Sequence, residues 1–175
     1  MSTGLVSELE RLVDALESDG TAAEVSLPAV AEKIAKALRV KTDEVAILAV
    51  SNRWKHLHFL VPQVLKNVGF IPLTSNSTLA ARTARESRPE INNSFSAVRH
   101  ASVFEGVKAA TTSESIQKIT SAPIFFEGKV VGVMQISRKG GNLASAGPDF
   151  TQEELRCVLA ICKPLGKLVS HLAGE

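Results

Sequence analysis

Hydrophobic residues recur with two different periods along this chain. Near the start they follow the three- and four-residue spacing of a helix, with Leu5, Leu9 and Leu12 separated by charged and polar positions. The same spacing returns in the next segment and again towards the C-terminus. Apolar residues spaced in this way lie along one side of an α-helix. The pattern therefore predicts helices over about residues 4–18 and 27–40, and a third from Thr151 onward.

Capping residues mark where these helices begin and end. Ser26 is a suitable N-cap, and Pro28 then falls in the first turn, where its missing N–H removes no helical hydrogen bond. Thr151 and Glu154 have the spacing of a capping box at the start of the last helix. Pro164 lies inside that helix and removes one backbone hydrogen bond, which predicts a kink or a break there.

The middle of the chain has the composition of β-strands. Two short apolar runs, Val45–Val50 and His56–Val61, are separated by turn residues, and we expect them to be antiparallel neighbours. A clearer pair, Ile119–Phe126 and Lys129–Arg138, is joined at Glu127-Gly128, where glycine readily takes positive φ. Between the pairs, Ser75–Ser87 is predicted to be a short helix that Pro89 ends.

The stretch from Asn92 to Ala110 follows no regular pattern, and irregular connections of that length inside a compact domain are usually functional. With 175 residues the chain suits one core of ordinary size, because single domains most often have about 100–150 residues. We therefore expect an amphipathic helix over residues 1–20 and one domain over residues 26–172.

Charge and hydropathy exclude several classes of partner. The net charge of +2 is too small to indicate a nucleic-acid partner, since phosphate binding needs basic residues clustered on one face. No apolar run reaches the roughly 20 residues that a bilayer span needs, so no membrane partner is expected either. The N-terminus lacks a basic cluster followed by an apolar run, which argues against a secretory signal and for a cytoplasmic protein.

Few residues have the spacing that catalysis or metal binding requires. Cys157 and Cys162 are five residues apart, about 140° around a helix, so they neither pair with each other nor clamp one metal ion. His56 and His58 share one face of a strand, but no cluster supplies further metal ligands, which favours structural roles. Neither a catalytic triad nor a phosphate-binding glycine loop is present. The sequence therefore predicts a protein that is not an enzyme, with no metal and no identified cofactor.

Three segments together carry a resemblance to a known family. They are IPLTSNSTLAARTARESRPEINN, SIQKITSAPIFFEGKVVGVMQIS and the Phe-Thr-x-Glu-Glu-Leu that opens the last helix. In their order and spacing, roughly residues 26–172 resemble the GAF domains, a family of small-molecule sensors. The resemblance implies an α+β fold, GAF/PAS-like, with a central antiparallel sheet of about six strands and the N- and C-terminal helices on one face.

The resemblance also implies a ligand pocket on the other face, roofed by the connections between about Asn76 and Lys108. Seven residues of this region are candidate ligand contacts: Asn76, Arg82, Asn92, Phe95, Arg99, His100 and Phe104. Phe125 and Met134 of the hairpin are two further candidates, because they are apolar side chains suited to line a cavity together with Phe95 and Phe104.

The residues that mark particular ligands in the family are not present here. Cyclic-nucleotide-binding members have Asn-Lys after the last hairpin strand, where this chain has Ser137 followed by Arg138. Bilin-binding members attach the pigment to a loop cysteine, whereas both cysteines here fall on the last helix. The ligand is therefore unknown.

The leading hypothesis is a stand-alone cytoplasmic GAF-type sensor that binds a small molecule and signals through its terminal helices in a homodimer. One alternative is a degenerate GAF scaffold, which dimerises or binds a partner without any ligand. A lower alternative is an enzyme similar to the methionine sulfoxide reductases of this family, which use several cysteines near the pocket.

Overall fold

The computed structural model describes residues 2–18, 22–53, 55–62, 65, 69–76, 78–95 and 115–172. These residues contain one six-stranded sheet in which every neighbouring pair is antiparallel. The strand order across the sheet is β3-β2-β1-β6-β5-β4. The strands are β1 Val45–Ser51, β2 His56–Val61, β3 Ile71–Pro72, β4 Glu90–Asn92, β5 Ser115–Phe126 and β6 Lys129–Gly140.

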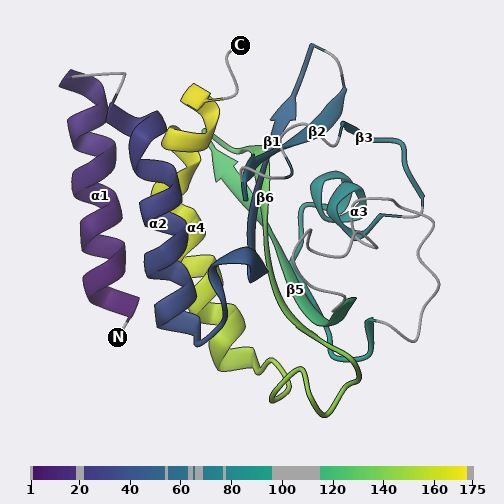
Figure 1. Ribbon diagram of the computed structural model, residues 1–175. Coiled ribbons are helices and arrows are strands. Elements are labelled where there is room, and N and C mark those ends of the chain that lie inside the picture. The colour runs from purple at the N-terminus through teal and green to yellow at the C-terminus, as the bar shows by residue number, and fades with distance from the viewer. Residues whose placement is uncertain are drawn as a thin grey trace.

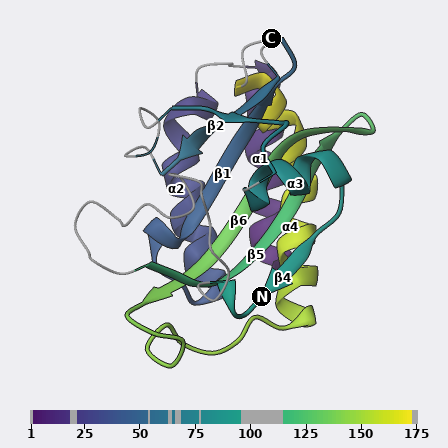
Figure 2. The ribbon, with the colours of Figure 1, turned by 90° about the vertical axis from the view of Figure 1, so that its right-hand side faces the viewer.

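Helices cover both faces of this sheet, as Figure 1 shows. One face carries α1 Ser2–Ser18, α2 Ala22–Leu38 and α4 Gln152–Leu172. The opposite face carries α3 Leu79–Glu86, which lies in front of the strands in Figure 2 while the terminal helices lie behind them. A short 3-10 helix, η1 Thr42–Glu44, leads from α2 into β1. The α+β class with a six-stranded antiparallel sheet, predicted from the sequence, is confirmed.

The near-continuous apolar run of β1 is explained by helices on both faces. Val45, Ile47 and Ala49 point into the core beneath the terminal helices. The alternate residues Leu48 and Val50 point to the α3 face. A strand that is buried on both sides needs apolar residues at every position, so its sequence does not alternate.

Helix α1 is part of the main core. Leu5 and Leu9 are 8% and 2% exposed and belong to the same hydrophobic cluster as α2 and α4. On the surface, the Lys33 ammonium lies 2.7 Å from the Glu8 carboxylate, and this hydrogen bond and charge lower the pKa of Glu8. The first helix therefore packs against the domain that follows it.

Two helix boundaries differ from the sequence prediction. Helix α2 begins at Ala22, before the expected Ser26 cap, so Pro28 lies inside it. Helix α4 continues for 21 residues through Pro164 without a break. Beyond Pro164, Leu165, Leu168 and Val169 are fully buried, and tertiary packing of this kind outweighs a local helix breaker.

The predicted hairpin is confirmed, and its strands are longer than expected. Strand β5 begins at Ser115 and β6 continues to Gly140. Glu127 and Gly128 both have positive φ, 52° and 78°, as the favoured two-residue hairpin turn requires.

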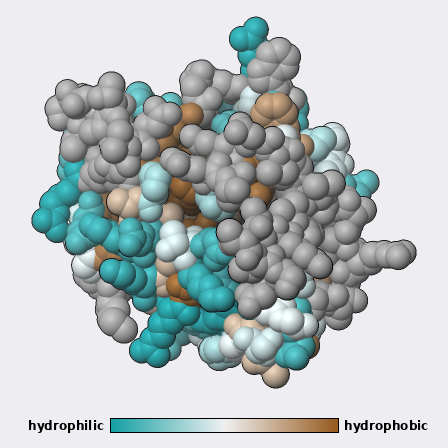
Figure 3. Space-filling model, viewed as in Figure 1, coloured by the Kyte–Doolittle hydropathy of each residue, from teal (hydrophilic) through white to brown (hydrophobic). Residues whose placement is uncertain are grey.

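On the side shown in Figure 3, hydrophilic residues cover the lower part of the helices and hydrophobic residues are visible mainly near the middle. Within the described ranges, no helix has both the length and the apolar character needed to cross a bilayer.

Candidate functional site

The α3 face of the sheet holds a buried surface to which distant parts of the chain contribute. Ala80 and Ala81 are fully buried where α3 meets the sheet, next to Leu48 and Val133. Side chains as small as alanine let a helix lie close to the strands below it. This close packing explains why small residues, Ala80 and Ala81, occupy the sheet-facing side of α3.

A chain of neutral polar side chains runs through this surface. The Thr83 hydroxyl lies 2.7 Å from the Ser121 hydroxyl and donates to the Leu79 carbonyl at 2.9 Å. The Gln135 amide donates to the Ser121 hydroxyl at 3.3 Å, because Ser121 and Gln135 are opposite each other in β5 and β6. Buried polar groups are normally hydrogen-bonded, and here they bond one another across three elements. We call Thr83, Ser121 and Gln135 the polar cluster.

At the start of α3, one hydroxyl is left over. Thr78 is 6% exposed and precedes Leu79, yet its side chain makes no capping hydrogen bond. Among the residues that the structure describes, its Oγ1 is buried without a hydrogen-bond partner. Burying a polar group without a partner costs roughly 1–3 kcal/mol, so Thr78 is a candidate contact for a bound molecule.

An apolar cluster adjoins the beginning of the same helix. Leu79, Phe95 and Ile119 form it, all 4% exposed or less, with Ile116 packed beside them. Together with the polar cluster, these side chains bring apolar groups and a few neutral hydrogen-bonding groups to the α3 face. Small-molecule sites generally have this composition.

Of the nine candidate ligand contacts, Phe95 lies in the apolar cluster. Asn76 is exposed ahead of α3. The Asn92 side chain accepts a hydrogen bond from the Ser94 N–H at 2.9 Å, which stabilises the turn after β4. Arg82 is half-exposed and pairs with Glu90 at 2.6 Å.

The remaining candidates are divided between other places. Met134 is fully buried beneath the terminal helices, on the opposite face of the sheet from α3. Because β6 alternates, its neighbours Val133 and Gln135 face α3 instead. Phe125 is 43% exposed near the β5–β6 turn. Arg99, His100 and Phe104 lie outside the described residues.

Three arginines in and just after α3 are engaged by other groups of the chain. Arg85 donates to the carbonyls of Leu73 and Ser75, both at 2.6 Å, and Arg88 pairs with Glu86 at 2.8 Å. With Arg82 paired to Glu90, these side chains hold the ends of α3 in place.

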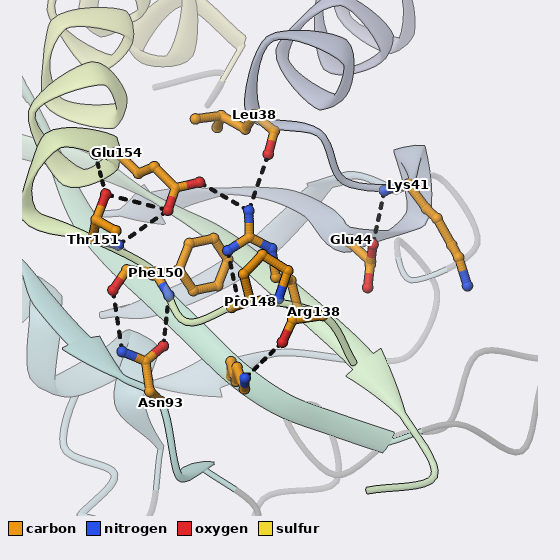
Figure 4. Close-up of polar contacts among 11 residues, drawn as sticks. Leu38, Lys41, Glu44, Asn93, Arg138, Pro148, Phe150, Thr151 and Glu154 are labelled. Atoms are coloured by element: carbon orange, nitrogen blue, oxygen red, sulfur yellow. Dashed lines mark hydrogen bonds and ion pairs between the residues drawn. The ribbon is translucent and has the colours of Figure 1, made fainter. Parts of the chain in front are cut away.

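A second polar arrangement lies on the terminal-helix side, around Arg138 of β6 (Figure 4). The guanidinium is 5% exposed and lies 2.8 Å from the Glu154 carboxylate. It also donates to the carbonyls of Leu38 at 3.3 Å and Pro148 at 3.0 Å. Its carbon centre lies 4.2 Å from the centroid of the Phe150 ring. One buried cation thus contacts the end of α2, the start of α4 and the segment before it.

Residues 147–150, here called the strap, lead directly into α4. Lys118 of β5 donates to the Gly147 carbonyl at 2.6 Å and pairs with Asp149 at 2.8 Å. Asn93 donates to the Phe150 carbonyl at 3.1 Å and accepts the Phe150 N–H at 2.8 Å (Figure 4). Three side chains thus hold the strap: Lys118 of β5, Arg138 of β6 and Asn93, which follows β4.

The described histidines and cysteines are not arranged for a metal site or for thiol chemistry on the α3 face. The described residues contain no group of three histidine, cysteine or acidic side chains placed to hold a metal ion. His56 stacks on Phe70 with ring centroids 4.1 Å apart and meets His58 edge-on. Burial raises the pKa of the Cys162 thiol, and Cys157 packs against the same core beneath the terminal helices. Both cysteines thus lie on the other side of the sheet from the polar cluster.

Sequence reasoning missed Thr78, Thr83, Ser121 and Gln135. A usable signal was present for Gln135, because a polar residue interrupts the apolar run Val-Val-Gly-Val-Met. Thr83 and Ser121 are 38 positions apart, and nothing local connects them.

Solved structures share this fold, although no protein-family model and no curated protein matches the chain. The GAF domain of Acinetobacter phosphoenolpyruvate-protein phosphotransferase matches with a TM-score of 0.65 at 15% identity, covering 95% of this chain and 93% of that one. A methyl-accepting chemotaxis protein segment matches with a TM-score of 0.66 at 14% identity, covering 98% and 99%. Free methionine-R-sulfoxide reductase from Neisseria meningitidis, solved with its substrate, matches with a TM-score of 0.64 at 16% identity, covering 99% and 92%.

These likenesses extend over almost the whole of each chain. The sequence identity is low, so they establish the fold and leave the function to be argued from the site. The fold is that of the GAF domains, as the resemblance in the sequence implied.

Proposed function

We propose that this chain, which has the GAF-domain fold, is a cytoplasmic sensor or regulatory domain that binds a small molecule on the α3 face of its sheet. The observation that carries the proposal is the buried Thr78 hydroxyl at the start of α3, for which the described part of the chain supplies no hydrogen-bond partner. The same helix contributes Thr83 to the polar cluster. A ligand with a hydrogen-bonding group would relieve the cost of burying the Thr78 hydroxyl.

Two structural neighbours support a sensing role. The Neisseria reductase was solved with its small-molecule substrate, so a protein of this fold holds a ligand. The chemotaxis protein is a signalling protein, and its segment matches 98% of this chain. We extend small-molecule binding and signalling to this chain as part of the proposal.

The proposal treats the chain as a non-enzyme, although reductases are among its neighbours. Thiol reduction of a sulfoxide needs a reactive thiolate within reach of the substrate. The sequence has two cysteines, and α4 holds both on the side of the sheet away from the polar cluster. A cysteine-based reductase site on the α3 face would therefore lack its nucleophile.

A scaffold without a ligand is the second candidate, and one observation favours it. Ala80 and Ala81 bring α3 directly onto Leu48 and Val133, so this part of the α3 face is filled by the chain's own side chains. In that case, α3 would serve only to cover the sheet.

Thermal-shift screening against a panel of metabolites separates the two candidates. A ligand that binds the folded chain stabilises it in proportion to the logarithm of its concentration over Kd. We expect at least one neutral hydrogen-bonding metabolite to raise Tm, and the rise to shrink in Thr78→Val. Thr74→Val, an exposed threonine in the connection before α3, is the matched control. A panel without any stabilising compound, or a rise that Thr78→Val leaves intact, would contradict binding at this site.

Signalling through a homodimer is the second part of the proposal. A groove of about 580 Å³ runs between α1 and α4 on the outside of the helix layer. Val6, Glu10, Leu159, Ala160, Lys163 and Pro164 line it. Apolar walls with one acidic and one basic residue suit a second copy of the same surface, in which Glu10 of each copy meets Lys163 of the other.

A further inference from the structure

The strap joins the α3 face to the terminal helices through hydrogen bonds that can be followed one by one. On the α3 side, Phe95 is buried against Leu79 and Ile119. Asn93, two residues earlier in the chain, bonds both the N–H and the carbonyl of Phe150. A displacement of the backbone at Asn93 therefore acts on Phe150 from two sides.

Phe150 is also linked to α2 and α4, through Arg138. Its ring lies under the Arg138 guanidinium, which bonds Glu154 in the first turn of α4 and the Leu38 carbonyl at the end of α2 (Figure 4). The Leu38 carbonyl is one of the terminal groups that a helix leaves without an internal partner, and a cation suits the negative end of the helix dipole.

Glu154 has two tasks in this arrangement. One carboxylate oxygen accepts the Thr151 N–H at 3.0 Å as part of the capping box, and the other accepts from Arg138 at 2.8 Å. The bond that starts α4 and the bond that holds Arg138 thus share one carboxylate. Moving Arg138 would loosen the first turn of α4.

Stability alone gives little reason for a buried ion pair here. A well-packed apolar replacement of such a pair is often neutral or stabilising, whereas a pair can specify one arrangement over others. The Arg138 contacts fix the relative positions of α2, α4 and the strap.

We propose that Asn93, Phe150 and Arg138 form a coupling path that passes a change at the apolar cluster around Phe95 to the adjacent ends of α2 and α4. These three are positioning residues, and the path rests on the proposed sensor function, for which it supplies the route from the α3 face to the helices. A path of this kind requires that a perturbation at one end be felt at the other, and that breaking the middle interrupt it.

Amide hydrogen exchange, measured residue by residue with NMR, tests the path without any ligand. The perturbation is Phe95→Leu, which leaves an apolar side chain in the cluster. The readouts are the amides of Glu154 and Leu155, which bond the Thr151 side chain and carbonyl. We expect Phe95→Leu to speed their exchange by about threefold or more. In an Asn93→Ala background, the same substitution should leave their rates unchanged.

A matched control separates coupling from general destabilisation. Val50→Ala also removes apolar volume from the α3 face, at a residue outside the apolar cluster and the strap contacts. When amide exchange is compared with that of the centre of β1, the exchange rates of Glu154 and Leu155 in Val50→Ala should stay close to those of the unsubstituted chain.

Two results would overturn the coupling path. One is an equal rise at all amides after Phe95→Leu, and the other is a rise at Glu154 and Leu155 that persists with Asn93→Ala. Should Asn93→Ala not fold, Asn93→Asp provides the same test, because it keeps the acceptor and loses the donor to the Phe150 carbonyl. Since the measurement involves no ligand, its failure leaves the metabolite screen to judge the sensor function separately.

Discussion

The hydroxyls of Thr83 and Ser121 form the central contact of the polar cluster. The changes in the free energy of unfolding caused by substituting these two residues should therefore not be additive. Thr83→Val keeps the shape of the side chain but removes its hydroxyl, so the Ser121 hydroxyl loses one of its hydrogen bonds. We expect it to lower the free energy of unfolding by about 1–3 kcal/mol. The double variant with Thr83→Val and Ser121→Ala should lose less stability than the sum of the losses in the two single variants, by about 1 kcal/mol.

Urea unfolding of the two single variants and the double variant measures this coupling. Thr74→Val, at an exposed position, is the control for the intrinsic effect of exchanging threonine for valine. Strictly additive free energies would show that the two hydroxyls do not depend on each other.

Cys162 is buried in the core, and burial raises the pKa of its thiol because a thiolate is poorly solvated there. Thiolate is the reactive form, so the folded chain should protect this residue at neutral pH. In a Cys157→Ser variant, we expect no reaction with iodoacetamide at pH 7 until urea unfolds the chain, as followed by mass spectrometry. Rapid labelling of the folded variant would show that the side chain is accessible.

At the scale of elements, Gly166 determines how closely α4 approaches the hairpin. A Cβ at this position would overlap the carbonyl oxygen of Phe125, which belongs to the backbone of β5 and cannot rotate away. Alanine is favoured over glycine in a helix interior by about 1 kcal/mol, so propensity alone predicts stabilisation by Gly166→Ala. We expect the opposite, a loss of about 1–3 kcal/mol or more, because the helix must shift.

Thermal and urea unfolding of Gly166→Ala test the close approach. Gly141→Ala is the control, since a Cβ there meets no atom within 4 Å. An unchanged or higher stability of Gly166→Ala would mean that α4 does not pack against Phe125 as described.

Most elements were predictable because their signals are local. The capping box at Thr151 and Glu154 and the turn at Glu127-Gly128 occur where the sequence indicated them. The continuity of α4 past Pro164 was not predictable, because the buried contacts of Leu165, Leu168 and Val169 outweigh the local preference there. The sequence also did not indicate that α2 begins as early as Ala22.

At the scale of the whole molecule, the proposed homodimer would use the groove between α1 and α4. Ala160→Glu would place a charge within the apolar wall of this groove. We expect it to shift the chain from dimer to monomer in sedimentation-velocity analysis, by at least tenfold in the dissociation constant, which corresponds to about 1.4 kcal/mol.

The same exchange at an exposed loop position, Ala144→Glu, is the control for added charge. Equal association of both variants and the unsubstituted chain would move the interface elsewhere. These substitutions test the interface better than deleting residues 1–20, because Leu5 and Leu9 belong to the main core and their loss would damage the fold.

The candidate site was less predictable than the fold. Phe95 lies in the apolar cluster of the α3 face, whereas Met134 lies beneath the terminal helices, although both were candidates as apolar side chains suited to line a cavity. A sequence window shows that β6 is buried without showing which of its faces meets α3. Thr83 and Ser121 became neighbours only when α3 docked over β5.

The sequence alone determined four α-helices, the four longer strands, the hairpin turn and the likeness to GAF domains, because periodicity, capping and turn chemistry act over a few residues. Only the tertiary structure decided which side chains share a face, leaving the Thr78 hydroxyl without a partner among the described residues and bringing Asn93, Phe150 and Arg138 together. Those contacts join residues up to 57 positions apart, and strand register and helix docking, which no local pattern encodes, bring them within hydrogen-bonding distance.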